Sequence, residues 1–219
     1  MTTTPITEEV IMFQILTEQS QHIPWNKGRL CGQKRPLKLQ EVWSIRFRLE
    51  MEKRTRDLAL FNLAIDSKLR ACDLMSLRVA DIAQGKRVQP RARIIQRKTG
   101  RPVQFEITEQ TRLAVEEWIA KAQLGPPDFL FPSRILKTSH LSRRQYGRIV
   151  DRWVSDIGLD PSQYGTHSLR RTKASLIYRK TKNIRAVQLL LGHTSLESTV
   201  RYLGIDEEDA LALAEQIEM

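Results

Sequence analysis

The last quarter of the chain gathers side chains that could act on a phosphate diester. His167 and Arg170 are three residues apart on a predicted helix, so their side chains project from one face. A planar guanidinium beside an imidazole suits a phosphate group, because its fork of donors matches the phosphate oxygens. His193 follows in a Leu-Gly-His turn. These residues predict a phosphate-binding site that needs a nucleophile.

Tyr202 is the candidate nucleophile. It lies on a short predicted helix, 196–203, which Thr194 and Glu197 would open as a capping box. A free phenol has a pKa of about 10, so about one molecule in a thousand is ionised at neutral pH. Attack by Tyr202 therefore requires a base or strong electrostatic help nearby.

The order of these residues resembles the tyrosine recombinases, also called the phage integrase family. The catalytic domain of that family carries Arg, Lys, His-x-x-Arg, His and Tyr in this order. Arg70 and Asp73 resemble the first arginine box, in which glutamate is commoner at the acidic position. Lys68 replaces the glycine or small residue that usually stands two before the arginine, and Lys98, ahead of Thr-Gly in a predicted hairpin, matches the family lysine. All six functional positions can be placed, in register, between Arg70 and Tyr202.

The resemblance covers about residues 36–219. Within the family, the chain is similar to the short single-domain recombinases, a group that includes the enzymes inverting fimbrial promoters. We expect an N-terminal helix and basic linker at 1–35, a catalytic domain at 36–205, and an acidic C-terminal helix at 206–219 that contacts another subunit. The core-binding domain of two-domain members is not expected, because only about 35 residues precede the catalytic region.

The resemblance implies covalent catalysis on DNA. Tyr202 would attack the scissile phosphodiester, form a 3′-phosphotyrosyl bond and release a 5′-hydroxyl. Arg70 and Arg170 would hold the non-bridging oxygens and neutralise the charge that builds up in the transition state. His193 would add a hydrogen bond to the same oxygens.

Two further residues would move protons. His167 is suited to take the proton of the tyrosine, and Lys98 would protonate the departing 5′-oxygen as general acid. The phosphotyrosine keeps the bond energy, so no ATP is required. No cofactor and no metal are expected, because no His, Cys, Asp or Glu cluster has ligand spacing.

Each of these residues also has a purely structural interpretation. Arg70 and Asp73 could form a surface ion pair, and His167 could be a structural histidine. His193 after glycine could be a helix cap only, and Tyr202 could be a half-buried packing residue. The occurrence of all six residues in the order typical of the family favours the catalytic interpretation.

Basic blocks elsewhere indicate contacts with DNA. Either Arg97 or Arg101 could replace Lys98 as the residue of the hairpin that reaches the DNA. Arg143 and Arg144 stand near the start of a helix that the family places at the major groove. The expected DNA-binding residues are Arg97, Arg101, Arg143, Arg144 and Arg171.

Composition agrees with a polyanionic partner. The chain of 219 residues has 36 basic and 25 acidic side chains, a net charge of +11 and a pI near 10.0, which is typical of nucleic-acid binders. Cys31 and Cys72 form no C-x-x-C pattern, which favours a reduced, cytoplasmic protein. The sequence has no apolar run that could span a membrane and no signal pattern.

Periodicity predicts a mainly α fold with a small antiparallel β-sheet, an α+β domain. Val103, Phe105 and Ile107 alternate with polar residues, which indicates a strand paired with 92–97 across a Lys-Thr-Gly turn. The expected helices are 7–20, 40–53, 55–65, 70–77, one around the stripe 115–122, 142–157, 167–180, 184–191 and 196–203.

The sequence therefore favours a site-specific recombinase that integrates, excises, inverts or resolves DNA. Its expected partners are double-stranded DNA and an accessory protein that bends DNA. We expect the protein to be a monomer in free solution and a homotetramer when synapsed on DNA. Two alternatives stay open at this point: a type IB topoisomerase, which rejoins the same strand, and a catalytically idle DNA-binding regulator on the same scaffold.

Overall fold

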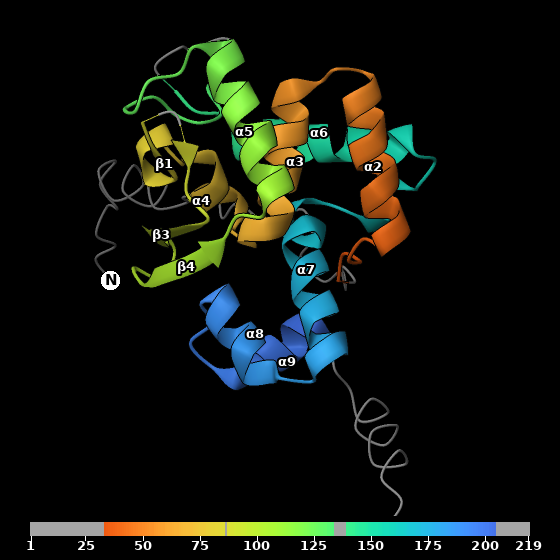
Figure 1. Cartoon of the computed structure of the whole chain (residues 1–219). Coiled ribbons are helices and arrows are strands. Elements are labelled where there is room, and N and C mark those ends of the chain that lie inside the picture. Colours follow the sequence, from red (N-terminus) through yellow and green to blue (C-terminus); the bar gives the residue numbers. More distant parts are fainter. Residues whose placement is uncertain (1–32, 86, 134–138, 205–219) are drawn as a thin grey trace, which may run out of the picture. The chain divides into compact units, whose positions relative to one another are not determined.

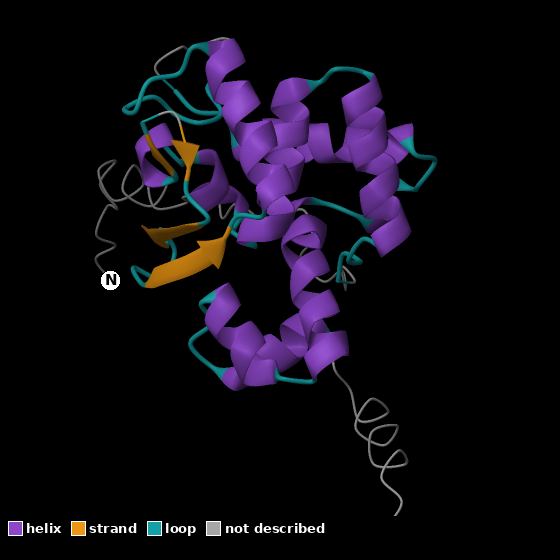
Figure 2. Cartoon of the chain, viewed as in Figure 1, coloured by secondary structure: helices purple, strands orange, loops and turns teal. Residues whose placement is uncertain are grey.

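Helices make up most of the computed structural model, which describes residues 33–85, 87–133 and 139–204 (Figures 1 and 2). The contacts reported below all lie within the compact unit Lys34–Met219. The described helices are α2 (Leu39–Met51), α3 (Thr55–Ser67), α4 (Ala71–Met75), α5 (Glu109–Ala122), α6 (Arg143–Asp156), α7 (Thr166–Thr181), α8 (Ile184–Leu191) and α9 (Leu196–Leu203), with 3-10 turns η1 (Val79–Asp81) and η2 (Pro161–Gln163). The expected helix 7–20 and the acidic segment 206–219 lie outside the described residues.

Helix α3 lies at the centre of the core. Apolar residues occupy all faces of this helix, which is typical of a helix that is buried on every side. Leu60, Phe61 and Leu63 are fully buried, and α3 contacts α2, α5, α7 and β4. Trp153 on α6 meets the Phe61 ring edge to face at 5.4 Å between centroids. This packing joins the first half of the chain to α6.

Two antiparallel hairpins are present in the described residues, where the sequence predicted one small sheet. The predicted hairpin is formed by β3 (Arg91–Ile95) and β4 (Pro102–Glu106), with Ile94 opposite Val103. Its turn contains Gly100 at φ +64°, a conformation that glycine adopts without cost. The second hairpin, β1 (Ala83–Gln84) with β2 (Arg87–Val88), has strands too short to produce a recognisable alternation.

Helices α7, α8 and α9 pack together around a second, smaller apolar cluster (Figure 1). Ala174, Val187 and Leu191 are fully buried there, and the Tyr202 ring packs against them. Gly192 ends α8 in the left-handed region at φ +64°, so the chain turns sharply into α9. The expected capping box of Thr194 and Glu197 is wrong by one residue: Ser195 is the N-cap and accepts a hydrogen bond from the Ser198 backbone.

Helix α4 is shorter than the expected 70–77. Arg70 has extended backbone angles and stands before the helix, which leaves its side chain at an element boundary. The helix ends at Met75 and the chain continues into η1. Among the described residues, no helix is long and apolar enough to cross a membrane.

The core packing predicts the effect of one substitution. Phe61→Ala removes a fully buried ring and its contact with Trp153, so we expect the free energy of unfolding to fall by about 3–5 kcal/mol. Phe47→Ala is the matched control, because that ring is 65% exposed, and its effect should stay within about 0.5 kcal/mol. Urea unfolding followed by circular dichroism measures both, and equal losses would contradict this description of the core.

Candidate active site

One cleft of about 550 Å³ brings together all six residues that the sequence singled out. They come from four separate segments: the turn before α4, the β3–β4 turn, the start of α7, and the α8–α9 pair. The lining residues include Arg70, Lys98, His167, Arg170, His193 and Tyr202, with Lys34, Thr99, Arg171, Gly192, Thr194 and Ser198.

Arg170 is buried at the base of the cleft. Its side chain is on α7 and only 2% of the residue is exposed. One guanidinium nitrogen, Nη1, donates to the backbone carbonyl of Lys68, and the other, Nη2, donates to the carbonyl of Leu191 at 2.8 Å. Burial lowers the pKa of Arg170, and the neighbouring Tyr202 opposes that change. An arginine keeps its charge even so, and its two carbonyl partners fix the direction of the fork.

Arg70 is oriented by a glutamine that the sequence analysis missed. Its Nη1 donates to Gln96 Oε1 at 2.6 Å, and Gln96 Nε2 donates to the carbonyl of Leu191 at 3.2 Å. Gln96 is 1% exposed and also accepts from the Thr99 hydroxyl at 3.0 Å. The Leu191 carbonyl therefore connects both arginines of the cleft, Arg170 directly and Arg70 through Gln96.

A weak signal for Gln96 was present in the sequence. Ala92, Ile94 and Gln96 follow the period of two that places them on one face of the hairpin, and that face turns inward. A polar residue at an inward position needs hydrogen-bond partners. Gly192 leaves room for it, because a Cβ at that glycine would lie 3.0 Å from Gln96 Nε2.

The Tyr202 ring is held by a histidine and two arginines. His193 contacts it edge to face at 5.2 Å between ring centroids. The guanidinium carbons of Arg171 and Arg170 lie 4.7 and 5.9 Å from the ring centroid. The Tyr202 hydroxyl is 3.5 Å from the carbonyl of His167, a long contact in which the hydroxyl donates. Burial raises the pKa of Tyr202, while Arg170 and Arg171 oppose the rise, so the phenol is protonated near neutral pH.

Both histidines of the cleft are neutral near pH 7. Partial burial and the positive charges of Arg170 and Arg171 lower the pKa of His167. Burial and the charges of Arg170 and Arg70 lower the pKa of His193 to about 4. A neutral imidazole can accept a proton, which His167 would need to do as a base. The ring of His193 is oriented by a contact of 3.2 Å between its Nδ1 and the Thr199 hydroxyl.

Asp73 supports the lysine hairpin. The surface ion pair considered for Arg70 and Asp73 does not form between these two described residues; Asp73 is 1% exposed, and its Oδ1 accepts from the backbone N–H of Arg97 at 2.9 Å. Lys98 is the next residue, is exposed, and lines the cleft beside Arg70 and His167. This carboxylate thus fixes the backbone that carries Lys98.

The expected DNA-binding arginines occupy different positions. Arg143 and Arg144 are exposed at the start of α6 and line a neighbouring hollow of about 680 Å³, which also includes Arg70, Lys98 and His167. The side chains of Arg97 and Arg101 are exposed on the β3–β4 turn. Arg171 is only 6% exposed: its Nη1 donates to the Lys34 carbonyl, and its guanidinium lies over the Tyr202 ring.

The arrangement favours a bound anion next to a phenol. Hydrogen-bonded guanidinium groups, an exposed ammonium group and two neutral imidazoles surround one cleft. A phosphate diester fits this set of donors, because its non-bridging oxygens accept from arginine forks and a departing bridging oxygen can accept a proton from a lysine.

Comparison with known proteins places these observations in a family. Residues 38–209 match the phage integrase family. The probable integrase/recombinase YoeC of Bacillus subtilis is 31% identical over 162 residues, covering 74% of this chain and 84% of that protein. The tyrosine recombinase XerC of Erythrobacter litoralis is 27% identical over 161 residues, covering 74% of this chain and 50% of that protein. The chain thus spans most of YoeC but about half of the XerC relative.

Solved structures share the fold. The XerA recombinase superposes with a TM-score of 0.66 at 18% identity, covering 83% of this chain and 62% of that chain. The XerH site-specific recombinase, bound to its palindromic difH substrate after cleavage, superposes with a TM-score of 0.65 at 23% identity, covering 83% of this chain and 52% of that chain.

The lowered pKa of His193 predicts a pH dependence of stability. The unfolded chain binds a proton at this histidine near pH 6.5, whereas the folded chain does so only near pH 4. Acidification through this window therefore favours unfolding, and we expect His193 to account for a loss of about 1–2 kcal/mol after allowance for solvent screening in the open cleft. The contribution of His193 to the free energy of unfolding is present above pH 6.5 and is lost as the pH falls toward 4.

The measurement is urea unfolding at several pH values between 8 and 4 for the wild type and for His193→Gln. Each protein is referred to its own stability at pH 8, so a general effect of the substitution cancels. The variant should lose less stability on acidification. Parallel curves would show that His193 is not the group that responds.

Proposed function

Because this chain belongs to the phage integrase family, we propose that it is a tyrosine site-specific recombinase, which cleaves DNA through a 3′-phosphotyrosine and joins the end to a partner strand. The observation that supports this most is the common cleft of the six family positions, in which the Tyr202 ring lies against Arg170.

The arginines and Tyr202 carry the covalent step. Arg70 and Arg170 hold the non-bridging oxygens of the scissile phosphate, and both approach it with directions set by protein hydrogen bonds. Tyr202 Oη attacks the phosphorus, a new O–P bond forms, and the 5′-oxygen of the next nucleotide leaves. Donors that are already oriented stabilise the developing charge without reorganising during the reaction, which is usually the largest catalytic contribution.

Two proton transfers accompany this exchange. His167 accepts the phenol proton, and its lowered pKa keeps the imidazole neutral and ready beforehand. Lys98, whose side chain is exposed on the β3–β4 turn, donates a proton to the departing 5′-oxygen. His193 donates a hydrogen bond to a phosphate oxygen. In the reverse direction a 5′-hydroxyl attacks the phosphotyrosine, which has kept the bond energy, so no ATP enters the scheme.

Recombination requires two duplexes and therefore several copies of the protein. Four copies would act together on double-stranded DNA, from monomers free in the cytoplasm, with the acidic segment 206–219 contacting a neighbouring subunit and an accessory protein bending the DNA. Arg97, Arg101, Arg143 and Arg144 would contact the backbone or the bases around the cleft, and Arg171 would support Tyr202 beside the phosphate.

The target site can be found from the reaction itself. The protein is mixed with fragments of its host genome, denatured, and the DNA that stays covalently bound is sequenced. Recombination at discrete sites predicts a small set of ends joined at their 3′ phosphate. Relaxation of supercoiled plasmid without such sites would instead support a type IB topoisomerase, and binding without any covalent product would support a DNA-binding regulator.

The first catalytic prediction concerns Tyr202→Phe. This variant keeps the ring and its packing but loses the attacking oxygen, so it should bind the captured site normally and form no covalent complex. A nicked suicide substrate followed by denaturing electrophoresis measures the complex. Tyr178→Phe is the matched control on α7, and it should cleave like the wild type; an undiminished covalent band in Tyr202→Phe would exclude Tyr202 as the nucleophile.

A second prediction separates Lys98 from the arginines. A 5′-bridging phosphorothiolate has a leaving group that needs no proton, so this substrate should restore most of the cleavage lost in Lys98→Ala. The same substrate should help Arg70→Ala much less, because that arginine acts on the non-bridging oxygens. Equal responses of the two variants would remove Lys98 as general acid and direct attention to Arg97 or Arg101.

A further inference from the structure

Lys68 combines two features that are costly for a lysine. It ends α3 in the left-handed region, at φ 52° and ψ 25°, where glycine is the least strained residue. Its side chain is also fully buried, at 0% exposure, and a buried charge is unfavourable unless it is paired. A lysine at this position therefore depends on strong compensating interactions.

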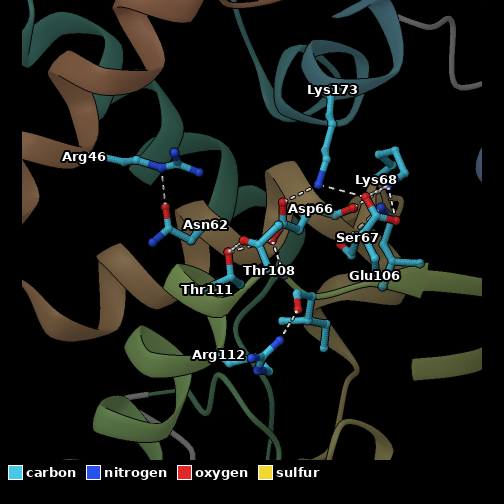
Figure 3. A network of polar contacts seen from close by, with 12 residues as sticks. Arg46, Asn62, Asp66, Ser67, Lys68, Glu106, Thr108, Thr111, Arg112 and Lys173 are labelled. Atoms are coloured by element: carbon cyan, nitrogen blue, oxygen red, sulfur yellow. Dashed lines mark hydrogen bonds and ion pairs between the residues drawn. The ribbon is translucent and has the colours of Figure 1, made fainter. Parts of the chain in front are cut away.

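Those interactions form a closed group of charges, the Lys68 cluster, made of Asp66, Lys68, Glu106 and Lys173 (Figure 3). Lys68 Nζ donates to both Glu106 oxygens at 2.8 and 3.0 Å and to the Asp66 carbonyl at 2.5 Å. Lys173 Nζ lies between Glu106 Oε1 at 2.8 Å and Asp66 Oδ1 at 2.6 Å. Two positive and two negative groups balance, and they join α3, β4 and α7.

Burial lowers the pKa of Lys68, although the charge of Glu106 opposes that change, whereas the environment favours the charged form of the two acids and of Lys173. Burial would raise the pKa of Asp66, but hydrogen bonds from Lys173 and Thr108 outweigh it and hold that pKa below its usual value. Burial would also raise the pKa of Glu106, but the charge of Lys68 and hydrogen bonds from Lys173 and Lys68 outweigh it and lower that pKa. Lys173 responds in the opposite sense: hydrogen bonds to Asp66 and Glu106 outweigh burial and raise its pKa.

The cluster is connected to both catalytic arginines. The backbone carbonyl of Lys68 accepts from Arg170 Nη1, so the peptide that the cluster holds is also the support of this guanidinium. Arg70 follows Lys68 by two residues, and Lys173 follows Arg170 by three on the same helix. A shift of the Lys68 peptide would therefore move the two groups that are proposed to hold the phosphate.

We propose that Lys68 is a positioning residue for DNA cleavage, whose side chain, paired with Glu106, fixes the turn that orients Arg170 and Arg70. This inference rests on the proposed function of the cleft. The lysine contacts no substrate; it acts through the carbonyl that receives Arg170. A glycine would relieve the backbone strain but would leave Glu106 without its buried partner and the turn without its anchor.

The main test compares Lys68→Met with Lys53→Met in the full-length protein. Lys53 has the same left-handed backbone, at φ 51°, but is exposed, so it controls for the conformation and for the loss of one charge. Single-turnover formation of the covalent complex should slow at least about tenfold in Lys68→Met, because small displacements of positioning groups have large kinetic effects. DNA binding should change less than about threefold, and Lys53→Met should match the wild type.

A second substrate separates positioning from a general loss of structure. A methylphosphonate at the scissile position lacks one negative oxygen, so its reaction depends less on the arginines. The defect of Lys68→Met should shrink on this substrate, as should the defect of Arg170→Ala, whereas partial unfolding would slow both substrates equally. Glu106→Gln is the conservative second variant, and combining it with Lys68→Met should add no further slowing if the two side chains act through one contact.

The outcomes distinguish this inference from the proposed function. A wild-type protein that forms no covalent complex would contradict the proposed function. A wild type that cleaves, with a Lys68→Met variant that is equally fast or equally slowed on both substrates, would overturn the inference alone. Crystal structures of both proteins without DNA test the geometry directly: an Arg170 guanidinium that leaves the Lys68 carbonyl supports the role, and an unchanged contact overturns it.

Discussion

A buried guanidinium, that of Arg170, is the group on which the rest of this site depends. A charge almost removed from solvent must find hydrogen-bond partners, and two backbone carbonyls supply them from opposite ends of the catalytic region. Lys68 ends the central helix α3, and Leu191 ends α8. The arginine therefore ties the core of the domain to the small α7–α9 group that carries Tyr202, and the fold and the site are stabilised by the same contacts.

Burial and the positive charge of Arg170 act together on the two histidines of the cleft, and they oppose each other at Tyr202. Burial lowers the pKa of both histidines and the charge of Arg170 lowers it further, whereas the same charge opposes the rise that burial imposes on the pKa of Tyr202. In the free protein the cleft thus holds neutral imidazoles, a protonated phenol and unbalanced cations. A phosphate diester would neutralise part of that charge, and the same imidazole that is neutral beforehand would then gain affinity for the proton that the phenol loses.

The six residues that meet in the cleft could be singled out from the sequence. The six catalytic candidates have distinctive types and a distinctive order, and the β3–β4 hairpin has a clear alternation on β4 together with a glycine turn. Helix boundaries were close to the observed ones because glycine and capping residues mark several of them, although Ser195 rather than Thr194 opens α9. Adjacent serine and threonine residues are equivalent as caps in a sequence, and only the backbone geometry distinguishes them.

Residues that act by holding others could not be predicted in the same way. Gln96 meets Arg70 and Leu191 across 26 and 95 residues of sequence, and no local pattern encodes such contacts. Lys68 looked like a mild departure from a glycine position, yet it is fully buried and paired with Glu106 on β4. Its role follows from the packing of three elements rather than from its neighbours in the chain.

The most direct test of the whole account is the chemical identity of the covalent link. The trapped protein–DNA complex is digested with nuclease and protease, and the peptide that carries a nucleotide is sequenced by mass spectrometry. We expect a single modified residue, Tyr202, joined to a 3′ phosphate. A nucleotide on any of the other three tyrosines of the chain, or a link through a 5′ phosphate, would contradict it.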